Sequence, residues 1–264
     1  MNNAIGVFDS GVGGLTVARE IMRQLPNETI YYFGDVKNCP YGDKTKEEII
    51  KNTDRAVKFL IDKGVKLVVL ACNTATAAAL EYLQSKYEVP IIGVVQPGAR
   101  RAIQATENNK VLVLGTKFTA NSKVYDIEIE NINSDIIVFD KACPAFVPFI
   151  ESEGNLDKEA TKKLISDTLG KTNMLGVDTV VLGCTHYPIL KKDIEDYYGN
   201  NIKVISSGRE AEREVSTVLG YAKLHQKKLN KKEHRFFISQ ESDNFDSIAS
   251  KWLKKDINAE VVEI

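Results

Sequence analysis

Two cysteines, Cys72 and Cys184, stand at the same point of two similar stretches. Each follows a short apolar run, Leu-Val-Val-Leu-Ala in the first case and Thr-Val-Val-Leu-Gly in the second, and each precedes small polar residues. Such a run is typical of a buried parallel strand, and open α/β sheets bind ligands at the carboxyl ends of their strands. Two strands of this kind that face each other would bring both thiols to one cleft.

Proton transfer at a carbon atom is the chemistry that uses two opposed thiols. Inversion of a stereocentre with an acidic C–H needs a base on one face and an acid on the other. A thiol with a pKa near 8.5 is only about 3% ionised at pH 7, so neighbours must stabilise the thiolate or accept its proton. Asp9 and His186 are the candidates for that role. Polar side chains beside the cysteines, with amides at helix starts, could hold a substrate carboxylate: Ser10, Asn73, Thr74 and Thr185.

Other uses of the cysteines fit the sequence less well. Zinc and a thioredoxin-like redox pair both favour Cys-x-x-Cys, whereas the closest spacing here is Cys184-x-His186, so no metal is expected. A thiol hydrolase could pair Cys184 with His186, but it leaves Cys72 unused. An inert buried thiol is the ordinary interpretation of either cysteine alone. Because both cysteines occupy the same place in similar stretches, we do not expect the two of them to be inert.

The elements that must position these residues form a pattern that occurs twice. Asp9 lies 63 residues before Cys72, and Thr116 lies 68 residues before Cys184. We predict strands at 4–9, 29–34, 89–95, 110–115, 135–139, 202–205, 235–238 and 261–264, besides the two runs before the cysteines. Amphipathic patterns predict helices at about 15–25, 45–63, 73–86, 157–170 and 209–227, one from residue 189, and one that contains Trp252.

This repeat predicts an α/β protein with two similar lobes. Each lobe has a mainly parallel sheet flanked by helices, the lobes are related by a pseudo-two-fold axis, and the active site lies in the cleft between them. We expect the first lobe to comprise residues 1–96 and 209–264. The second lobe comprises residues 97–208.

The length, composition and charge of the chain limit the classes of function that it can have. The chain has 264 residues, 43% of them hydrophobic, which is enough for one large domain or two smaller ones. Its 35 basic and 36 acidic residues leave a net charge of -1, which gives no electrostatic reason to expect nucleic acid or a membrane surface as a partner. No signal peptide or apolar span is evident, and four widely spaced cysteines predict reduced thiols in the cytoplasm.

The glycine-rich stretch after the first strand, Asp9-Ser10-Gly-Val-Gly-Gly-Leu-Thr16, is a strand-to-helix turn. Its amides would favour an anion such as a carboxylate or phosphate, and a purely structural turn is also open. A dinucleotide loop needs a different glycine spacing, and a Walker loop needs Gly-Lys-Ser/Thr, which is absent here.

At these residues the sequence resembles the glutamate racemases of bacterial cell-wall synthesis. The resemblance rests on the stretch from Phe8 to Val17, on Cys-Pro40-Tyr41-Gly42, on Ala-Cys72-Asn-Thr-Ala-Thr76, on Pro-Gly-Ala at 97–99, and on Leu-Gly-Cys184-Thr-His-Tyr-Pro. It implies interconversion of L- and D-glutamate without a cofactor. It also implies that Cys72 takes the α-proton from D-glutamate, that Cys184 takes it from L-glutamate, and that Asp9 and His186 assist.

The resemblance further implies which residues line the substrate. These are Asp9, Ser10, Tyr41, Gly42, Asn73, Thr74, Thr185 and His186, to which we add Pro40, Thr76, Thr116 and Thr119, with Glu151 in a supporting role. Without the resemblance, Pro-Tyr-Gly would be interpreted as a surface turn. A small-molecule substrate is the expected partner, and the assembly is expected to be a homo-oligomer, most simply a dimer. Aspartate racemisation is the nearest alternative; a gyrase-binding protein and a Cys-His hydrolase are the others.

Overall fold

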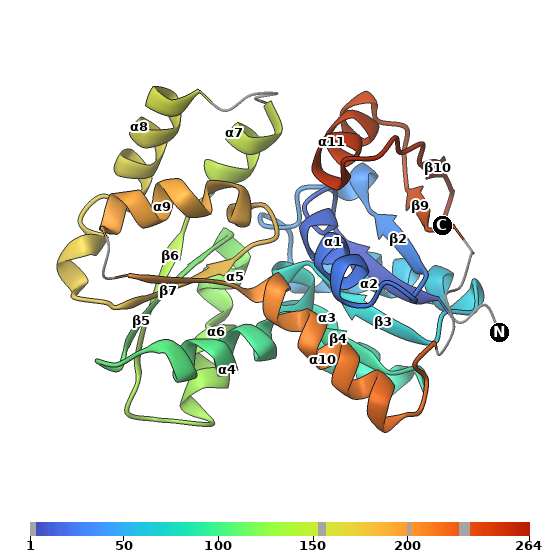
Figure 1. The fold of residues 1–264 in the computed structure, drawn as a ribbon, viewed down its shortest axis with the longest axis horizontal. Coiled ribbons are helices and arrows are strands. Elements are labelled where there is room, and N and C mark those ends of the chain that lie inside the picture. Colours follow the sequence, from blue (N-terminus) through green and yellow to red (C-terminus); the bar gives the residue numbers. More distant parts are fainter. Residues whose placement is uncertain (1–3, 153–156, 200–201, 227–232) are drawn as a thin grey trace.

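The computed structural model describes residues 4–152, 157–199, 202–226 and 233–264, which form two parallel sheets (Figure 1). The first sheet has the strand order β10-β9-β2-β1-β3-β4. Its strands are β1 (Ile5–Asp9), β2 (Ile30–Gly34), β3 (Leu67–Leu70), β4 (Ile91–Gly93), β9 (Arg235–Ile238) and β10 (Glu260–Val261). The second sheet has the order β6-β5-β7-β8, with β5 (Lys110–Gly115), β6 (Ile137–Ala142), β7 (Thr179–Gly183) and β8 (Lys203–Ser206).

Helices cover both faces of each sheet. In chain order they are α1 (Leu15–Gln24), α2 (Lys46–Asp62), α3 (Asn73–Lys86), α4 (Val95–Ala105), α5 (Lys117–Ser122), α6 (Val124–Glu130), α7 (Phe146–Ser152), α8 (Lys158–Leu169), α9 (Lys191–Tyr198), α10 (Ser207–Tyr221) and α11 (Asp243–Leu253). Short 3-10 turns lie at Val36–Asn38, Thr172–Leu175 and Tyr187–Leu190. None of the described helices is long and apolar enough to cross a bilayer.

The two sheets repeat one topology, as the sequence predicts. The order β2-β1-β3-β4 in the first sheet matches β6-β5-β7-β8 in the second, so β3 corresponds to β7. Cys72 follows β3 and Cys184 follows β7. The predicted α/β fold with two similar lobes is therefore confirmed, and the cysteines occupy equivalent positions in it.

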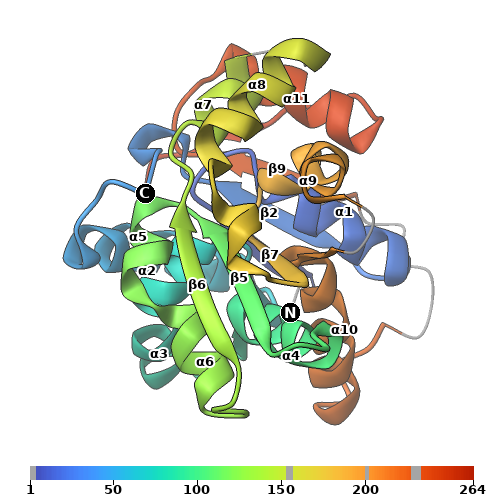
Figure 2. The ribbon, with the colours of Figure 1, turned by 90° about the vertical axis from the view of Figure 1, so that its left-hand side faces the viewer.

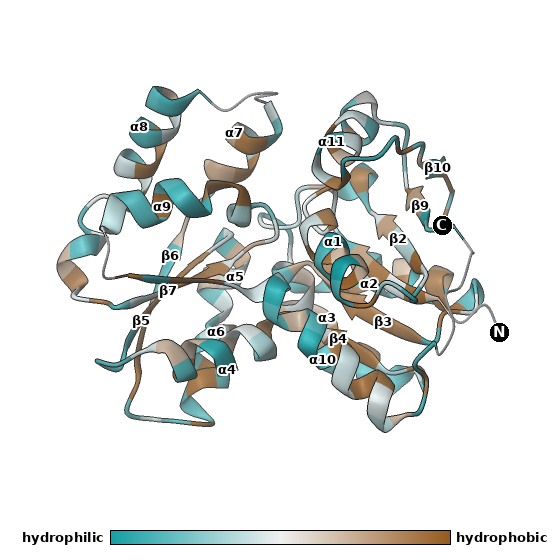
Figure 3. Cartoon of the chain, viewed as in Figure 1, coloured by the Kyte–Doolittle hydropathy of each residue, from teal (hydrophilic) through white to brown (hydrophobic). Residues whose placement is uncertain are grey.

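Burial explains why these runs become central strands. Every residue of β1, β2, β3 and β7 is buried, as expected for strands that helices cover on both faces. Figure 3 shows hydrophobic residues concentrated on these strands and on the inner sides of the helices. At the surface, Thr45 and Glu48 form a capping box that begins α2.

Several predicted boundaries differ from the structure. The sequence predicts a strand at 89–95, but β4 spans only Ile91–Gly93 and the segment 95–105 is α4. Pro97 lies in the first turn of α4, where proline is tolerated. The sequence predicts one helix after Ser122, whereas the structure has α5 and α6, which are separated by Lys123 in a left-handed conformation (φ 56°). The helix expected at 209–227 ends at Tyr221, and Lys227 lies outside the described residues.

The lobes are joined through α4 and α10. Helix α10 packs against both α1 and α4, while β9 and β10 belong to the first sheet. Figure 2, turned by 90°, shows β6 at the outer edge of the second sheet. We propose that the first lobe comprises residues 1–96 and 209–264 and the second residues 97–208. These limits place the junctions inside α4 and α10.

Candidate active site

A cavity of about 430 Å³ lies where the carboxyl ends of the two sheets meet. Among the residues proposed from the sequence, those that line it are Ser10, Pro40, Tyr41, Gly42, Cys72, Asn73, Thr74, Thr116, Glu151, Cys184, Thr185 and His186. They follow β1, β2, β3, β5, β6 and β7, so both lobes contribute. This is the edge at which α/β sheets place ligands.

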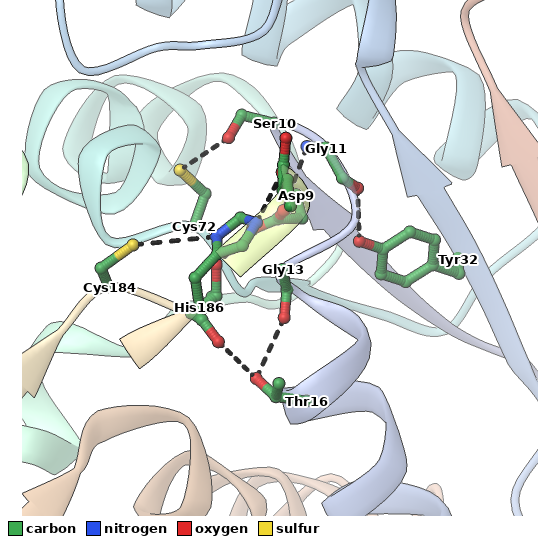
Figure 4. Close-up of polar contacts among 11 residues, drawn as sticks. Asp9, Ser10, Gly11, Gly13, Thr16, Tyr32, Cys72, Cys184 and His186 are labelled. Atoms are coloured by element: carbon green, nitrogen blue, oxygen red, sulfur yellow. Dashed lines mark hydrogen bonds and ion pairs between the residues drawn. The ribbon is translucent and has the colours of Figure 1, made fainter. Parts of the chain in front are cut away.

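Both cysteines that the sequence proposes as catalytic residues line this cavity. Cys72 is 6% exposed and Cys184 is 7% exposed, and Figure 4 shows the two side chains approaching the same space from different elements. Cys72 caps the start of α3: its Sγ accepts a hydrogen bond from the Ala75 amide at 3.4 Å and its thiol donates to Ser10 Oγ at 3.6 Å. The alternative of an inert thiol in a dry interior does not fit either residue.

Cys72 rests as a thiol. Burial, helped by the charge of Asp9, raises its pKa to about 12, while the hydrogen bonds that Cys72 makes with Ala75 and Ser10 oppose the rise. A group with so high a pKa keeps its proton at neutral pH. It is therefore suited to donate a proton to a carbon atom rather than to remove one first.

Cys184 has a different neighbour. Its Sγ lies 3.9 Å from His186 Nδ1, and His186 Nε2 lies 2.7 Å from Glu151 Oε1. Burial lowers the pKa of His186, but the hydrogen bonds and charges of Cys184 and Glu151 outweigh it and raise the pKa to about 10. An imidazolium at this place stabilises negative charge on the Cys184 sulfur. The supporting role expected for Glu151 has a direct geometric basis in this chain of contacts.

Asp9 lies behind the cavity and is fully buried. Its Oδ2 accepts from the Gly11 amide at 3.0 Å and its Oδ1 from Thr185 Oγ1 at 3.3 Å. Burial raises the pKa of Asp9, although the charge of His186 and hydrogen bonds from Gly14 and Gly11 oppose that rise. Amides of the glycine turn, expected to bind a ligand anion, thus bind the carboxylate of the protein itself.

The glycines of this turn make room for the proposed catalytic side chains. A Cβ atom on Gly13 would lie 2.4 Å from both Cε1 and Nδ1 of His186, and a Cβ atom on Gly14 would lie 2.4 Å from Cβ of Asp9. No side chain fits at such distances. The glycines therefore admit His186 from the facing lobe and Asp9 from their own lobe.

Gly13→Ala is expected to lower kcat for racemisation by about 10²-fold, because displacement of a reacting group by about 1 Å can cost that much. Gly220→Ala is the matched control, since its Cβ would meet its nearest atom, Nε2 of His225, at an ordinary 3.8 Å. Steady-state kinetics of both variants checks this. Equal activity of the two variants would contradict the role assigned to Gly13.

Three threonine hydroxyls form a cluster at the side of the cavity. Thr74 Oγ1 lies 2.9 Å from Thr116 Oγ1 and 3.3 Å from Thr119 Oγ1. Thr119 is fully buried behind the other two, so it supports them without lining the cavity. Thr76 lies elsewhere: its hydroxyl is bonded to the carbonyls of Leu70 and Cys72, and its side chain borders a separate surface groove.

The Pro-Tyr-Gly segment is part of the site and not a surface turn. Tyr41 is 2% exposed, and its hydroxyl donates to Asp35 Oδ2 at 2.6 Å. Ser239, in the C-terminal segment, donates to Asp35 Oδ1 at 2.7 Å. Burial raises the pKa of Tyr41, so the phenol keeps its proton and its donor role. The hydroxyl of Tyr41 therefore anchors the loop.

Tyr41→Phe is expected to lower the free energy of unfolding by about 1 kcal/mol and to raise KM, because it removes a buried hydrogen bond that holds the cavity loop. Tyr87→Phe is the control, since the hydroxyl of Tyr87 donates to Asp54 at 2.9 Å outside the cavity. Urea denaturation and kinetics measure both quantities. If KM rises equally in both variants, the hydroxyl of Tyr41 has no specific role in holding the cavity loop.

Sequence reasoning missed several residues that line the cavity. Cys39 and Cys143 both reach it, and so do Phe245 and Ile248 of α11. The sequence predicts a helix around Trp252 on the first lobe, but no pattern in it indicates that residues of this helix reach the site. Within the described ranges, no three His, Cys, Asp or Glu side chains gather in a way that could hold a metal ion.

Comparison with known proteins places this site in a family. A family model described as Asp/Glu/Hydantoin racemase matches residues 5–215. The chain belongs to the Asp/Glu/hydantoin racemase family.

Within this racemase family, several glutamate racemases are similar to the chain over its whole length. The glutamate racemase of Staphylococcus haemolyticus is 47% identical over 264 residues, which cover 100% of this chain and 99% of that protein. The structure of a glutamate racemase isoform from Bacillus anthracis superposes with a TM-score of 0.94 at 40% identity, covering 99% of this chain and 97% of that one. A Francisella tularensis glutamate racemase in complex with D-glutamate has a TM-score of 0.92 at 34% identity, covering 99% and 98%.

Proposed function

We propose that this chain interconverts L- and D-glutamate by proton transfer between the α-carbon and two cysteines, without a cofactor. The observation that carries the proposal is that Cys72 and Cys184 follow equivalent strands of a repeated fold and line one cavity. Relatives that align with the whole chain are glutamate racemases, and one of them was crystallised with D-glutamate. The two-thiol arrangement supplies the acid and the base that inversion requires.

The resting site suits the conversion of L- to D-glutamate. Cys184, whose thiol proton passes to His186 Nδ1 at 3.9 Å, acts as the base that removes the α-proton from L-glutamate. Cys72, whose pKa is raised to about 12 by burial and the charge of Asp9, then donates its proton to the opposite face. At the end the two sulfurs have exchanged protonation states.

The reverse reaction needs the protons to be redistributed first. Asp9, whose pKa is raised by burial, accepts the proton of Cys72, and His186 donates one to Cys184. Cys72 then removes the α-proton from D-glutamate, and Cys184 donates to the other face. At the end of this reaction Asp9 holds one extra proton and His186 lacks one, so the resting site is restored when Asp9 releases its proton to solvent and His186 takes one up.

Kinetics with both candidate substrates tests the proposal. Protein treated with a chelator and given no cofactor is incubated with L-glutamate, D-glutamate, L-aspartate or D-aspartate, and the enantiomers are separated by chiral chromatography. Either glutamate enantiomer is expected to reach an equal mixture, with aspartate much slower. Faster conversion of aspartate would favour the aspartate alternative, and a failure to convert either amino acid would reject a racemase function.

The pH dependence of kcat/KM is expected to be bell-shaped. Activity should rise with pH as Asp9 ionises, above its ordinary range because burial raises its pKa, and should fall above pH of about 10 as His186 loses its proton. His186→Asn should remove the fall on the alkaline side. An unchanged alkaline limb in that variant would assign the limb to another group.

The biological setting follows from the same proposal. D-glutamate made by this chain would serve peptidoglycan synthesis in the cytoplasm, and we propose a homodimer, which light scattering after size-exclusion chromatography measures. A Cys-His hydrolase would leave Cys72 dispensable. A gyrase-binding function would survive loss of both cysteines, as measured by DNA supercoiling.

A further inference from the structure

The amide of Asn73 lies at the start of α3, directly after Cys72, and lines the cavity. Its Oδ1 accepts from the hydroxyl of Tyr125 at 2.6 Å and from Ser207 Oγ at 3.3 Å. Its Nδ2 is buried and has no hydrogen-bond partner in the described part of the chain. A buried donor without a partner costs about 1–3 kcal/mol, so such a group indicates a missing ligand.

We propose that Tyr125 is a positioning residue that holds the amide of Asn73 so that Nδ2 donates to a carboxylate of the substrate. This inference rests on the proposed function, because it takes glutamate as the ligand. Oδ1 and Nδ2 share one planar group, so the hydrogen bond that fixes the oxygen also fixes the direction of the donor. A reversed amide would present oxygen to the carboxylate, which repels it.

Packing holds the hydroxyl of Tyr125 in place. Tyr125 is fully buried on α6 of the second sheet, and glycines lie along both edges of its ring. A Cβ atom on Gly98 would lie 3.3 Å from Cε1 of the ring, and one on Gly183 would lie 3.2 Å from Cε2. Burial raises the pKa of Tyr125, so the phenol keeps the proton that it donates to Asn73.

Ser207 is the weaker of the two donors. Its single proton has a second acceptor, the carbonyl of Leu182 at 3.2 Å, which is slightly nearer than Asn73 Oδ1 at 3.3 Å. Tyr125 and Asn73 belong to elements on different sheets, so the stronger bond crosses between the lobes. The second lobe thereby orients a donor that the first lobe presents to the substrate.

Tyr125→Phe is expected to lower kcat/KM for glutamate about 5-fold, mostly through KM, because the ring remains and one hydrogen bond is lost. The decisive measurement is a double-mutant cycle with Asn73→Ala. In the Asn73→Ala background, Tyr125→Phe should change kcat/KM less than about 2-fold, since the hydroxyl acts only through the amide. Should Asn73→Ala not fold, Asn73→Ser serves as the second leg of the cycle.

Tyr198→Phe is the control, because its hydroxyl pairs with Thr172 at 2.6 Å outside the cavity, and it should leave kcat/KM unchanged. An equal fall from Tyr125→Phe with and without the Asn73 amide would overturn the inference, since it would show an effect on the fold alone. Failure of the proposed function looks different. In that case the parent protein itself would not racemise glutamate, and calorimetry would detect no glutamate binding.

Discussion

Replacement of Cys72 or Cys184 by serine is expected to lower kcat for glutamate racemisation by about 10³-fold or more. A serine hydroxyl keeps the shape of the thiol but is a far weaker acid, so proton transfer on that face of the substrate stops. Glutamate binding should persist, because each sulfur contributes little to holding the carboxylates. Chiral chromatography measures the loss, and calorimetry measures the binding.

The equilibrium between enantiomers provides an internal check on this result. Because the equilibrium constant of a racemisation is one, kcat/KM must fall equally for L- and D-glutamate in either variant. Cys143→Ser is the comparison variant, since this thiol is buried at the same cavity and bonds only the carbonyl of Lys141, at 3.6 Å, within the described part of the chain. It should keep most of the activity. A fall as large as that of the Cys72 and Cys184 variants would mean that cavity packing, not proton transfer, explains the loss.

Asp9→Asn is expected to lower kcat by about 10²- to 10³-fold. Asparagine has nearly the same shape but cannot accept the proton of Cys72, which is the role proposed for the carboxylate. The substitution also removes the acceptor of the hydrogen bond from the Gly11 amide or from Thr185. At the same time it removes a charge that is costly to bury. These effects on stability oppose each other, so we expect the melting temperature to change little.

The Asp9→Asn variant should therefore lose much of its kcat while its melting temperature changes little. Ser10→Ala is a useful neighbour for comparison, because Ser10 accepts a hydrogen bond from the Cys72 thiol at 3.6 Å but carries no exchangeable charge. Its loss of kcat should be much smaller. A melting temperature that falls sharply together with kcat in Asp9→Asn would indicate a structural role for the carboxylate.

The position of both cysteines could be predicted because it depends on local signals. A short β-branched run flanked by polar residues indicates a buried parallel strand, and the two runs before Cys72 and Cys184 form β3 and β7. Their repeated spacing then predicts equivalent places in two lobes. The glycine turn after Asp9 is also evident from the sequence, although the sequence does not show that Gly13 makes room for His186 of the other lobe.

The remaining parts depend on contacts between residues far apart in the chain. Nothing near Tyr125 indicates that its hydroxyl reaches Asn73, 52 positions away. Likewise Phe245 reaches the cavity only because β9 returns to the first sheet and carries α11 over the site. The place of Thr76 in a motif predicts a contact with substrate, but helical geometry turns its hydroxyl back to the carbonyl of Cys72.

Incorporation of solvent deuterium tests the central claim, that two separate thiols act on opposite faces of one carbon. L-glutamate is incubated with the protein in D2O, and both enantiomers are isolated early and analysed by mass spectrometry. Proton transfer by two thiols predicts one deuterium at the α-carbon of nearly every D-glutamate molecule and almost none in the remaining L-glutamate. Retention of the original hydrogen in D-glutamate, or equal labelling of both enantiomers, would show that a single base performs the reaction and that the two thiols do not share it.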